Sequence, residues 1–249
     1  MVGVEISNAD TVRILHHAFG DAFKTITIIT EQDSFKIIGV DETSSIAVQM
    51  QIELTMLGAH LFDSSIRFPV FTKDFSTYLG YSTSGYIPSQ VPLQMPIRLN
   101  IQDTHMDLFI TSQNIWSLRK IFLPVPEGIE TLPQLPSFVG EPHCTTKNIS
   151  LLRLCYSVFE KAKKIILKMD AGKITFSSMD ADEVFEISGE GEGVASTILL
   201  PYVLDVVSKV WELSSIENLK ISISQGGLTQ FYYTFYNGAL WYAAPSSSE

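Results

Sequence analysis

The chain has 249 residues, of which 45% are hydrophobic and 18% are charged, and its formal net charge is −10. This length allows one large domain or two domains of about 100–125 residues, and the apolar content is sufficient for packed cores. No apolar run approaches the roughly 18–20 residues of a membrane-spanning helix, and the N-terminus lacks the pattern of a signal peptide. Two cysteines, Cys144 and Cys155, are too few for a disulfide framework. We therefore expect an intracellular, reduced protein, nuclear in a eukaryote and cytoplasmic in a prokaryote or archaeon.

The acidic balance counts against a DNA-binding domain that grips phosphates from one side, because such domains are usually basic. It does not exclude a protein whose basic residues are gathered on one surface, since the field near that surface is set locally. Any DNA-binding function therefore has to come from such a local concentration of cations.

The first half of the chain combines strand patterns with two helical patterns. An alternating strand over 2–7 is followed by Asn8, a suitable N-cap for a helix over 9–20. Thr72 is placed to cap a second helix over 72–79. Further apolar segments predict strands at 25–30, 35–40, 46–54, 57–62, 66–70, 97–101, 105–111 and 115–122.

The second half repeats this order. Asn148 is placed to cap a helix over 149–161, and Pro201 occupies a favoured first position of a fourth helix. The acidic, glycine-rich segment 189–193 predicts a turn. The apolar stripe of the helix over 149–161 comprises Leu151, Leu152, Cys155, Val158, Phe159 and Ala162. Strands are expected at 164–169, 173–178, 184–188, 219–224, 229–236 and 239–243.

Between the halves lies the segment LPVPEGIETLPQLP, residues 123–136. Its four prolines indicate a connector, because proline cannot donate to a sheet ladder and biases the preceding residue toward extended conformations. Two similar halves joined by such a connector suggest duplicated domains. A plain spacer is the alternative. Five apolar residues favour a segment that lies against a surface: Leu123, Val125, Ile129, Leu132 and Leu135.

An internal repeat supports the duplication. KTITIITEQDSFKIIGVDETSSIAV (24–48) parallels KKIILKMDAGKITFSSMDADEVFEI (163–187). In each segment a hairpin leads to an apolar residue followed by aspartate, Val40-Asp41 in the first and Met179-Asp180 in the second. Self-similarity of this kind is the sequence sign of duplicated structure.

Four features of the chain occur in a characteristic order. They are the hairpin and turn over 35–46, the segment 120–136, Arg153 and Cys155 on the helix over 149–161, and the ending LWYAAP at 240–245. In this order and spacing, and over nearly its full length, the chain resembles the sliding clamps of the proliferating cell nuclear antigen family. The first two features look like the family's central loop with its strand and its interdomain connecting loop. Arg153 and Cys155 stand where the family has an arginine and often a cysteine, and the ending looks like its C-terminal motif.

The resemblance implies an α+β fold of two similar clamp domains, each with two helices packed on antiparallel sheets. The N-terminal domain would span 1–122, the interdomain connecting loop 123–136 and the C-terminal domain 137–249. It also implies a ring of three subunits whose helices line a hole that holds duplex DNA. The partners would be duplex DNA, other clamp subunits, and a DNA polymerase, clamp loader, flap nuclease and ligase bound through a short peptide box. No enzymatic activity, cofactor, metal or membrane contact is implied.

Three sets of site residues follow. The cations expected to face DNA are Arg13, Lys73, Lys147, Arg153, Lys161 and Lys209, with ordinary surface cations as the alternative. Edge strands are expected at 115–122 and 184–189, so that unlike edges pair head to tail through Ile115, Trp116, Leu118, Val184, Phe185 and Ile187. The peptide pocket would be walled by Val40, Ser45, Val125, Ile129, Leu132, Tyr242, Ala244 and Pro245, with a plain cap on the core as the alternative.

The chain departs from the family in several of these places. The second helix offers only Lys73, and Tyr202 stands where an arginine is common, although Lys209 matches the family's lysine. Ser45 and Gly227 stand where the family has a bulkier residue and a proline. These differences favour a specialised clamp, such as one subunit of a heteromeric ring, a viral clamp or a checkpoint-type subunit.

The sequence offers no persuasive catalytic or metal-binding constellation. His143, Cys144 and Cys155 lack zinc-ligand spacing, and 180–183 lacks the glycine and terminal glutamate of a calcium loop. There is no phosphate-cradling glycine loop. Two alternatives to a sliding clamp stay open. One is a clamp-fold scaffold, checkpoint or transcription-linked subunit that does not encircle DNA itself. The other is an acidic β-rich enzyme whose active site the sequence does not reveal.

Overall fold

The structure, a computed structural model, describes the chain except residues 1, 7, 20–21, 32–33, 54–65, 84–96, 113–115, 126–140, 181, 211–215, 237 and 248–249. The chain forms two compact units, one of Met1–Glu42 with Gln49–Leu132 and the other of Thr43–Val48 with Pro133–Glu249. The strand expected at 57–62 lies outside the described residues, as do the predicted site residues Ile115, Ile129 and Leu132.

The first unit contains an antiparallel sheet in the order β1-β6-β7-β8. Along β6, Ile97, Leu99 and Ile101 are buried and the residues between them are more exposed, so one face of this sheet lies on the core. The strands of this sheet are β1 (Val2–Ile6), β6 (Ile97–Ile101), β7 (Met106–Ser112) and β8 (Trp116–Phe122). A second run of paired strands, in the order β4-β3-β2-β5, consists of β2 (Thr25–Thr30), β3 (Ser34–Val40), β4 (Ala47–Glu53) and β5 (Ile66–Phe71).

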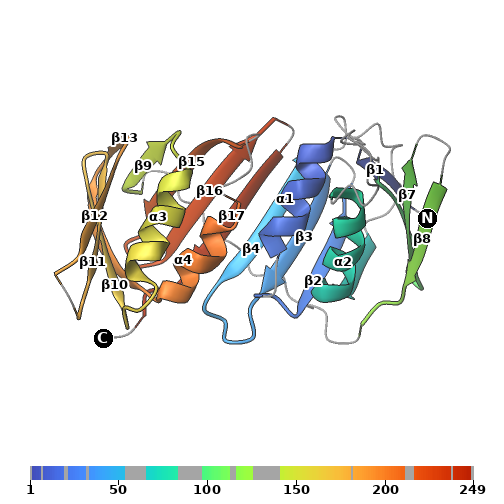
Figure 1. Cartoon of the computed structure of the whole chain (residues 1–249), viewed down its shortest axis with the longest axis horizontal. Coiled ribbons are helices and arrows are strands. Elements are labelled where there is room, and N and C mark those ends of the chain that lie inside the picture. The colour runs from blue at the N-terminus through green and yellow to red at the C-terminus, as the bar shows by residue number, and fades with distance from the viewer. Residues whose placement is uncertain are drawn as a thin grey trace. The chain divides into compact units, whose positions relative to one another are not determined.

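Two helices of the first unit, α1 (Ala9–Phe19) and α2 (Thr72–Thr83), pack side by side (Figure 1). Asn8 caps α1 as predicted, because its Oδ1 accepts hydrogen bonds from the backbone N–H groups of Asp10 and Thr11 at 2.8 and 3.2 Å. The predicted side-chain cap at Thr72 is wrong. Thr72 is itself the first residue of α2, and its buried Oγ1 has no hydrogen-bond partner among the described residues. The helix also continues beyond its predicted end at Leu79.

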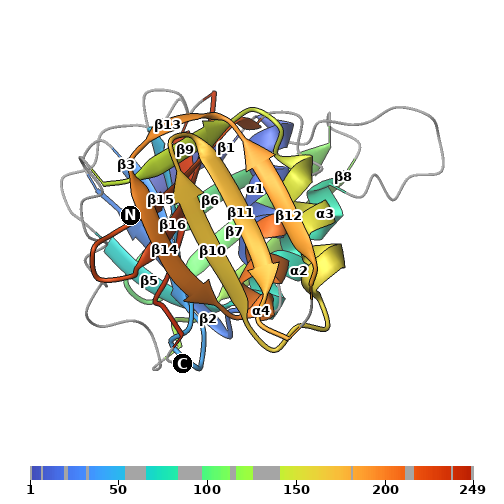
Figure 2. The same cartoon turned by 90° about the vertical axis from the view of Figure 1, so that its left-hand side faces the viewer.

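The second unit has the same plan. Figure 2 looks onto its antiparallel sheet, which runs in the order β12-β11-β10-β14. These strands are β10 (Ile165–Asp170), β11 (Lys173–Ser178), β12 (Val184–Ser188) and β14 (Val194–Leu199). A second run, β13-β9-β15-β16-β17, consists of β9 (His143–Thr146), β13 (Glu190–Glu192), β15 (Ile216–Ile223), β16 (Thr229–Phe235) and β17 (Gly238–Ala244). The α+β class with antiparallel sheets is therefore confirmed.

The helices of the second unit, α3 (Ser150–Phe159) and α4 (Pro201–Ser208), also pack together. Pro201 begins α4 as predicted. Asn148 does not cap α3, because Ile149 is the N-cap residue and has no side-chain cap bond. The Oδ1 of Asn148 instead accepts a hydrogen bond from Ser150 Oγ at 2.8 Å.

The predicted repeat is visible as two equivalent hairpins, β2–β3 in the first unit and β10–β11 in the second. The predicted turn at 189–193 is wrong, because Glu190–Glu192 forms β13 and pairs with β9. A Cβ at Gly191 would lie 2.0 Å from the carbonyl oxygen of His143, so only glycine permits this close backbone approach. The glycines that indicate a turn in the sequence therefore serve here to bring two strands together.

Candidate DNA-facing helices and subunit edges

Three predicted DNA-facing residues lie on the α3–α4 pair or beside it, and two of them share one carboxylate. Arg153 Nη1 lies 3.5 Å from Asp205 Oδ1, and Lys209 Nζ lies 3.8 Å from Asp205 Oδ2. Lys161 follows the end of α3 and is exposed. The structure thus brings Arg153 and Lys209 together across two helices, and Asp205 neutralises part of their charge.

Two tyrosines accompany these cations. Tyr156 on α3 lies beside Arg153, whose Cζ is 5.1 Å from the centre of the ring, and Tyr202 on α4 is exposed. Burial raises the pKa of Tyr156, and the nearby carboxylates of Asp205 and Glu160 raise that pKa further. The phenol of Tyr156 is therefore a neutral hydrogen-bond donor at physiological pH rather than a charged group.

The α1–α2 pair carries two of the predicted cations. Arg13 on α1 is exposed and pairs with Asp10 at 3.3 Å, and Lys73 is exposed in the first turn of α2. His16 holds the two helices together, because its Nδ1 lies 3.1 Å from the carbonyl oxygen of Ser76 and 3.2 Å from the Ser76 hydroxyl. Lys147 lies in the other unit, exposed, between β9 and α3.

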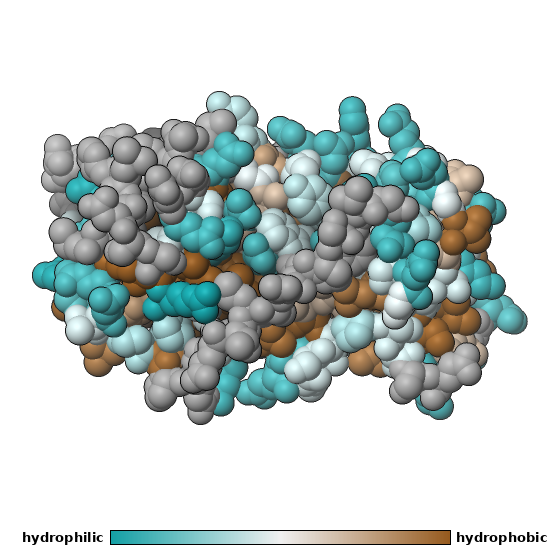
Figure 3. All heavy atoms as spheres, turned by 180° about the vertical axis from the view of Figure 1, so that it is seen from behind, coloured by the Kyte–Doolittle hydropathy of each residue, from teal (hydrophilic) through white to brown (hydrophobic). Residues whose placement is uncertain are grey.

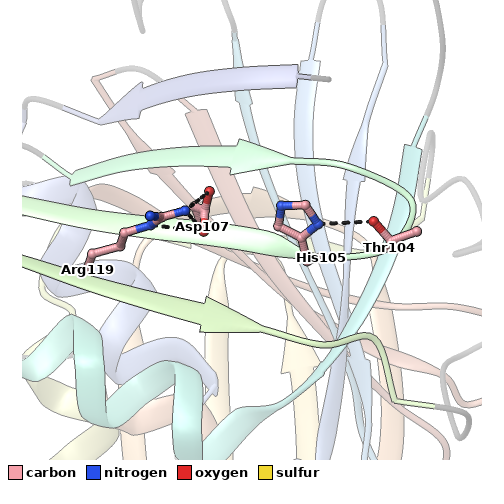
Figure 4. Close-up of polar contacts among 4 residues, drawn as sticks. All are labelled: Thr104, His105, Asp107 and Arg119. Atoms are coloured by element: carbon pink, nitrogen blue, oxygen red, sulfur yellow. Dashed lines mark hydrogen bonds and ion pairs between the residues drawn. The ribbon is translucent and has the colours of Figure 1, made fainter.

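The strand β8 forms one edge of the first unit's sheet. Its Leu118 is half-buried, and the side chain of Trp116 lies outside what the structure describes. On the exposed face Arg119 makes a bidentate pair with Asp107, from Nη2 to Oδ1 at 3.1 Å and to Oδ2 at 3.0 Å (Figure 4). The guanidinium also stacks 5.3 Å from the centre of the Phe109 ring. Beside it lies a hollow of about 400 Å³ that is lined by Glu5, Arg98, Asn100, Phe109 and Thr111. Two of these residues, Arg98 and Glu5, form an ion pair at 2.7 Å.

The strand β12 forms an edge of the second unit's sheet, as predicted. Val184 is 59% exposed and Phe185 is half-buried. Ile187, however, is fully buried, so its side chain belongs to the core of its own unit rather than to a surface available to a neighbour. The backbone of β12 and the side chain of Val184 are the parts that remain available.

Sequence reasoning missed two apolar residues beside this edge. Leu154 and Val158, one turn apart on α3, are 54% and 42% exposed, and α3 contacts β12. The prediction that Val158 lies on the buried stripe is therefore wrong. The signal in the sequence was the excess of apolar residues in α3, since Leu151, Leu152, Leu154, Cys155, Val158 and Phe159 are more than one buried stripe requires.

The predicted peptide pocket draws on residues of both units. In the first unit, Val40 and Val125 are half-buried, and the N–H of Val125 donates to the carbonyl oxygen of Pro69 at 3.1 Å. In the second unit, Ser45 is half-buried and Pro245 is exposed. Ala244 is fully buried, as is Tyr242, whose ring packs edge-to-face on Tyr233 at 6.1 Å. Tyr242 is therefore a core residue and not an exposed pocket wall, because it lies on the inward side of β17.

None of the helices in the described part of the chain is long and apolar enough to cross a bilayer. Figure 3 shows hydrophilic and hydrophobic side chains interspersed on the described surface of one face. Within the same described residues, no three His, Cys, Asp or Glu side chains are placed to hold a metal ion.

Comparison with known proteins identifies the fold of the chain. No protein-family model and no curated protein matches the sequence. Among solved structures, a PCNA2–PCNA3 complex from Sulfolobus tokodaii matches with a TM-score of 0.79, covering 99% of this chain and 100% of that chain at 15% identity. The chain has the fold of a PCNA-type sliding clamp. At this low identity the comparison establishes the clamp fold alone. Function has to be argued from features of the fold, which are the two helix pairs and the sheet edges β8 and β12.

Proposed function

We propose that the chain is a subunit of a DNA sliding clamp, a ring that encircles duplex DNA and keeps replication and repair proteins on it. The observation that carries the proposal is that each unit of this clamp fold has a sheet edge, β8 or β12, with exposed side chains beside it. Exposed edges invite pairing with another chain, and pairing of unlike edges closes a ring. The matched structure is itself a complex of two PCNA chains, which supports other clamp subunits as partners.

The charges of the two edges support pairing of β8 with β12. Strand β8 carries Arg119 and Lys120 and no acidic residue, although Arg119 is already paired with Asp107 of β7. Strand β12 carries Glu186, which is paired with Lys173 of β11 at 2.6 Å, and directly follows Glu183. Pairing of β8 with β8 would bring the two Lys120 cations together, and pairing of β12 with β12 would bring the two Glu183 carboxylates together. Unlike edges are therefore the favoured partners. The same contact would cover the exposed side chains of Leu154, Val158 and Val184.

The helix pairs supply the surface proposed to face DNA. Arg13, Lys73, Arg153 and Lys209 give this surface a few cations, although the whole chain is acidic. Few phosphate contacts suffice, because a closed ring is retained on DNA by its topology rather than by its affinity. Acidic outer surfaces would repel DNA, so duplex would be tolerated only inside the ring.

Recruitment of partners is proposed to use the exposed and half-buried part of the predicted pocket, namely Val40, Ser45, Val125 and Pro245. A polymerase, clamp loader, flap nuclease or ligase would dock a short peptide with aliphatic and aromatic anchors there. The chain itself would act as a non-enzymatic scaffold inside the cell.

The experiment that tests the proposal is loading onto a nicked circular plasmid by a clamp loader. The expected result is a complex that survives high salt and is lost when the plasmid is linearised. Salt-sensitive binding that does not depend on circularity would contradict encirclement.

A second candidate is a clamp-fold scaffold that does not encircle DNA. The partial neutralisation of Arg153 and Lys209 by Asp205 favours it, together with the exposed Tyr202 on the same helix pair. This candidate predicts normal assembly and peptide binding, but no topological retention on the circular plasmid.

A further inference from the structure

Asp205 pairs with two cations of the proposed DNA-facing surface of the second unit. One of its carboxylate oxygens lies 3.5 Å from Arg153 Nη1 on α3, and the other lies 3.8 Å from the Nζ of Lys209, which caps the C-terminal end of α4 one turn after Asp205. The side chain of Asp205 is less exposed than that of either cation. A single carboxylate thus pairs with both cations, and both cations remain partly exposed to solvent.

This geometry changes what the surface can offer a phosphate. Two cations with one carboxylate between them give a formal charge of +1 rather than +2. A phosphate that approaches either cation also approaches the carboxylate, and this like-charge repulsion opposes the contact. The neighbouring Tyr156 adds no positive charge, and Glu160 is a further carboxylate whose charge reaches it.

We propose that Asp205 limits the grip of the second unit on DNA. The cations remain near the duplex, but their contacts with phosphates are weakened, so that the affinity of this surface for DNA and its dependence on salt stay low. The inference rests on the proposed sliding-clamp function. It assigns to Asp205 the role of setting the salt dependence of DNA binding.

The test is equilibrium binding of a short, fluorescently labelled blunt duplex between about 50 and 200 mM KCl, followed by anisotropy. The variant is Asp205→Asn, which keeps the size of the side chain and removes its charge, with Asp205→Ala as a second variant. The matched control is Asp170→Asn, which makes the same charge change at an exposed residue of β10. Arg153→Ala and Lys209→Ala report whether this surface contacts DNA at all.

We expect both Asp205 variants to bind the duplex more tightly and with a steeper salt dependence. Each additional phosphate that the surface neutralises adds about 0.9 to the slope of log affinity against log salt, which is roughly threefold more loss of affinity over this salt range. The Asp170→Asn control should show the same slope of log affinity against log salt as the unchanged chain.

Three outcomes are decisive against the inference. Unchanged or weaker binding by the Asp205 variants, while Arg153→Ala and Lys209→Ala weaken binding, overturns the role of Asp205 and leaves the clamp function standing. An equal increase in the Asp170→Asn control shows an effect of net charge only and also overturns it. If the Arg153, Lys209 and Asp205 variants all bind like the unchanged chain, this surface does not contact DNA, and the proposed DNA contact fails together with the inference.

Discussion

Two tyrosines stabilise the core of the second unit. Tyr233 donates a hydrogen bond from its hydroxyl to the carbonyl oxygen of Val207 at 2.7 Å, which ties β16 to α4. Tyr242 packs edge-to-face against it from β17. Burial raises the pKa of both phenols, so both remain neutral at physiological pH. These side chains are therefore part of the packed interior that holds the helix pair on its strands.

Replacing Tyr242 with alanine should lower the free energy of unfolding by about 3–5 kcal/mol, because it leaves a cavity in the core. Tyr236→Ala is the matched control, since Tyr236 is 73% exposed and its removal should change stability by about 0.5 kcal/mol or less. Urea unfolding of the two variants measures the difference. Equal midpoints would show that Tyr242 is not a core residue.

The two cysteines should be unreactive while the protein is folded. Both thiols are buried, and burial raises the pKa of Cys144 and of Cys155, so the reactive thiolate is scarce at about pH 8. Alkylation with iodoacetamide followed by intact-mass measurement should show little modification in buffer and two additions in denaturant. Rapid labelling of the folded protein would contradict this burial.

At the scale of elements, the two outer strands of the second unit's four-stranded sheet differ in how far they are covered. In the second unit the N–H of Ser247 donates to the carbonyl oxygen of Ile198 at 2.8 Å, so the chain's own tail covers part of the β14 edge. At the opposite edge, β12 carries the exposed Val184 and is flanked by the exposed Leu154 and Val158 of α3. Backbone groups and apolar side chains together make β12 the edge suited to another chain.

Proline at Glu186 should prevent assembly, because the N–H of Glu186 points away from β11 toward the open edge of the sheet. The N–H of Ser178 donates to Glu183 and that of Gly189 to Gly172, so the odd-numbered residues of β12 are the ones that pair with β11. Glu186→Ala is the control, since it removes the same side chain and keeps the N–H. Light scattering of purified protein should give a lower mass for the proline variant than for the alanine variant. An assembled mass for both would contradict pairing through β12. A monomeric unchanged chain would instead indicate that a different clamp subunit supplies the partner edge.

Polar substitution of Leu154 and Val158 should weaken assembly without unfolding the unit. Each side chain is about half-exposed before assembly, so burying the remainder contributes about 1 kcal/mol, or roughly fivefold in affinity per residue. Leu154→Ser with Val158→Ser should therefore raise the dissociation constant about 25-fold. Val194→Ser, at a residue 75% exposed on β14, serves as the control. A dissociation constant that moves equally in the control would exclude a specific contact at α3.

Local patterns predicted much of this fold, because they depend on neighbouring residues. Asn8 caps α1, and the two repeated hairpins form where the sequence repeats. Tertiary packing decided the rest. Gly191 indicates a turn by composition but lies in a strand, because the close approach to His143 depends on a segment far away in sequence. The exposure of Val158 and the burial of Tyr242 likewise depend on which elements pack around them.

At the scale of the whole molecule, the net charge of −10 and the small number of cations on the helices both predict weak binding of DNA. A strongly basic surface would bind DNA tightly at low salt, whereas an acidic chain with a few partly neutralised cations binds it weakly. Weak contact with DNA does not retain a protein that depends on affinity alone. It is sufficient for a closed ring, because the ring is retained by encircling the duplex. The charge distribution is therefore consistent with the proposed clamp function rather than opposed to it.

The different charges of β8 and β12 have a directional consequence. Chains joined through unlike edges follow one another in the same sense, and no two-fold axis relates neighbours in such an arrangement. An assembly of this kind has a front and a back, so every chain presents the same side toward the same end of an enclosed duplex. A protein docked on one chain would then travel along DNA in a fixed orientation, with its active site always ahead of the assembly or always behind it.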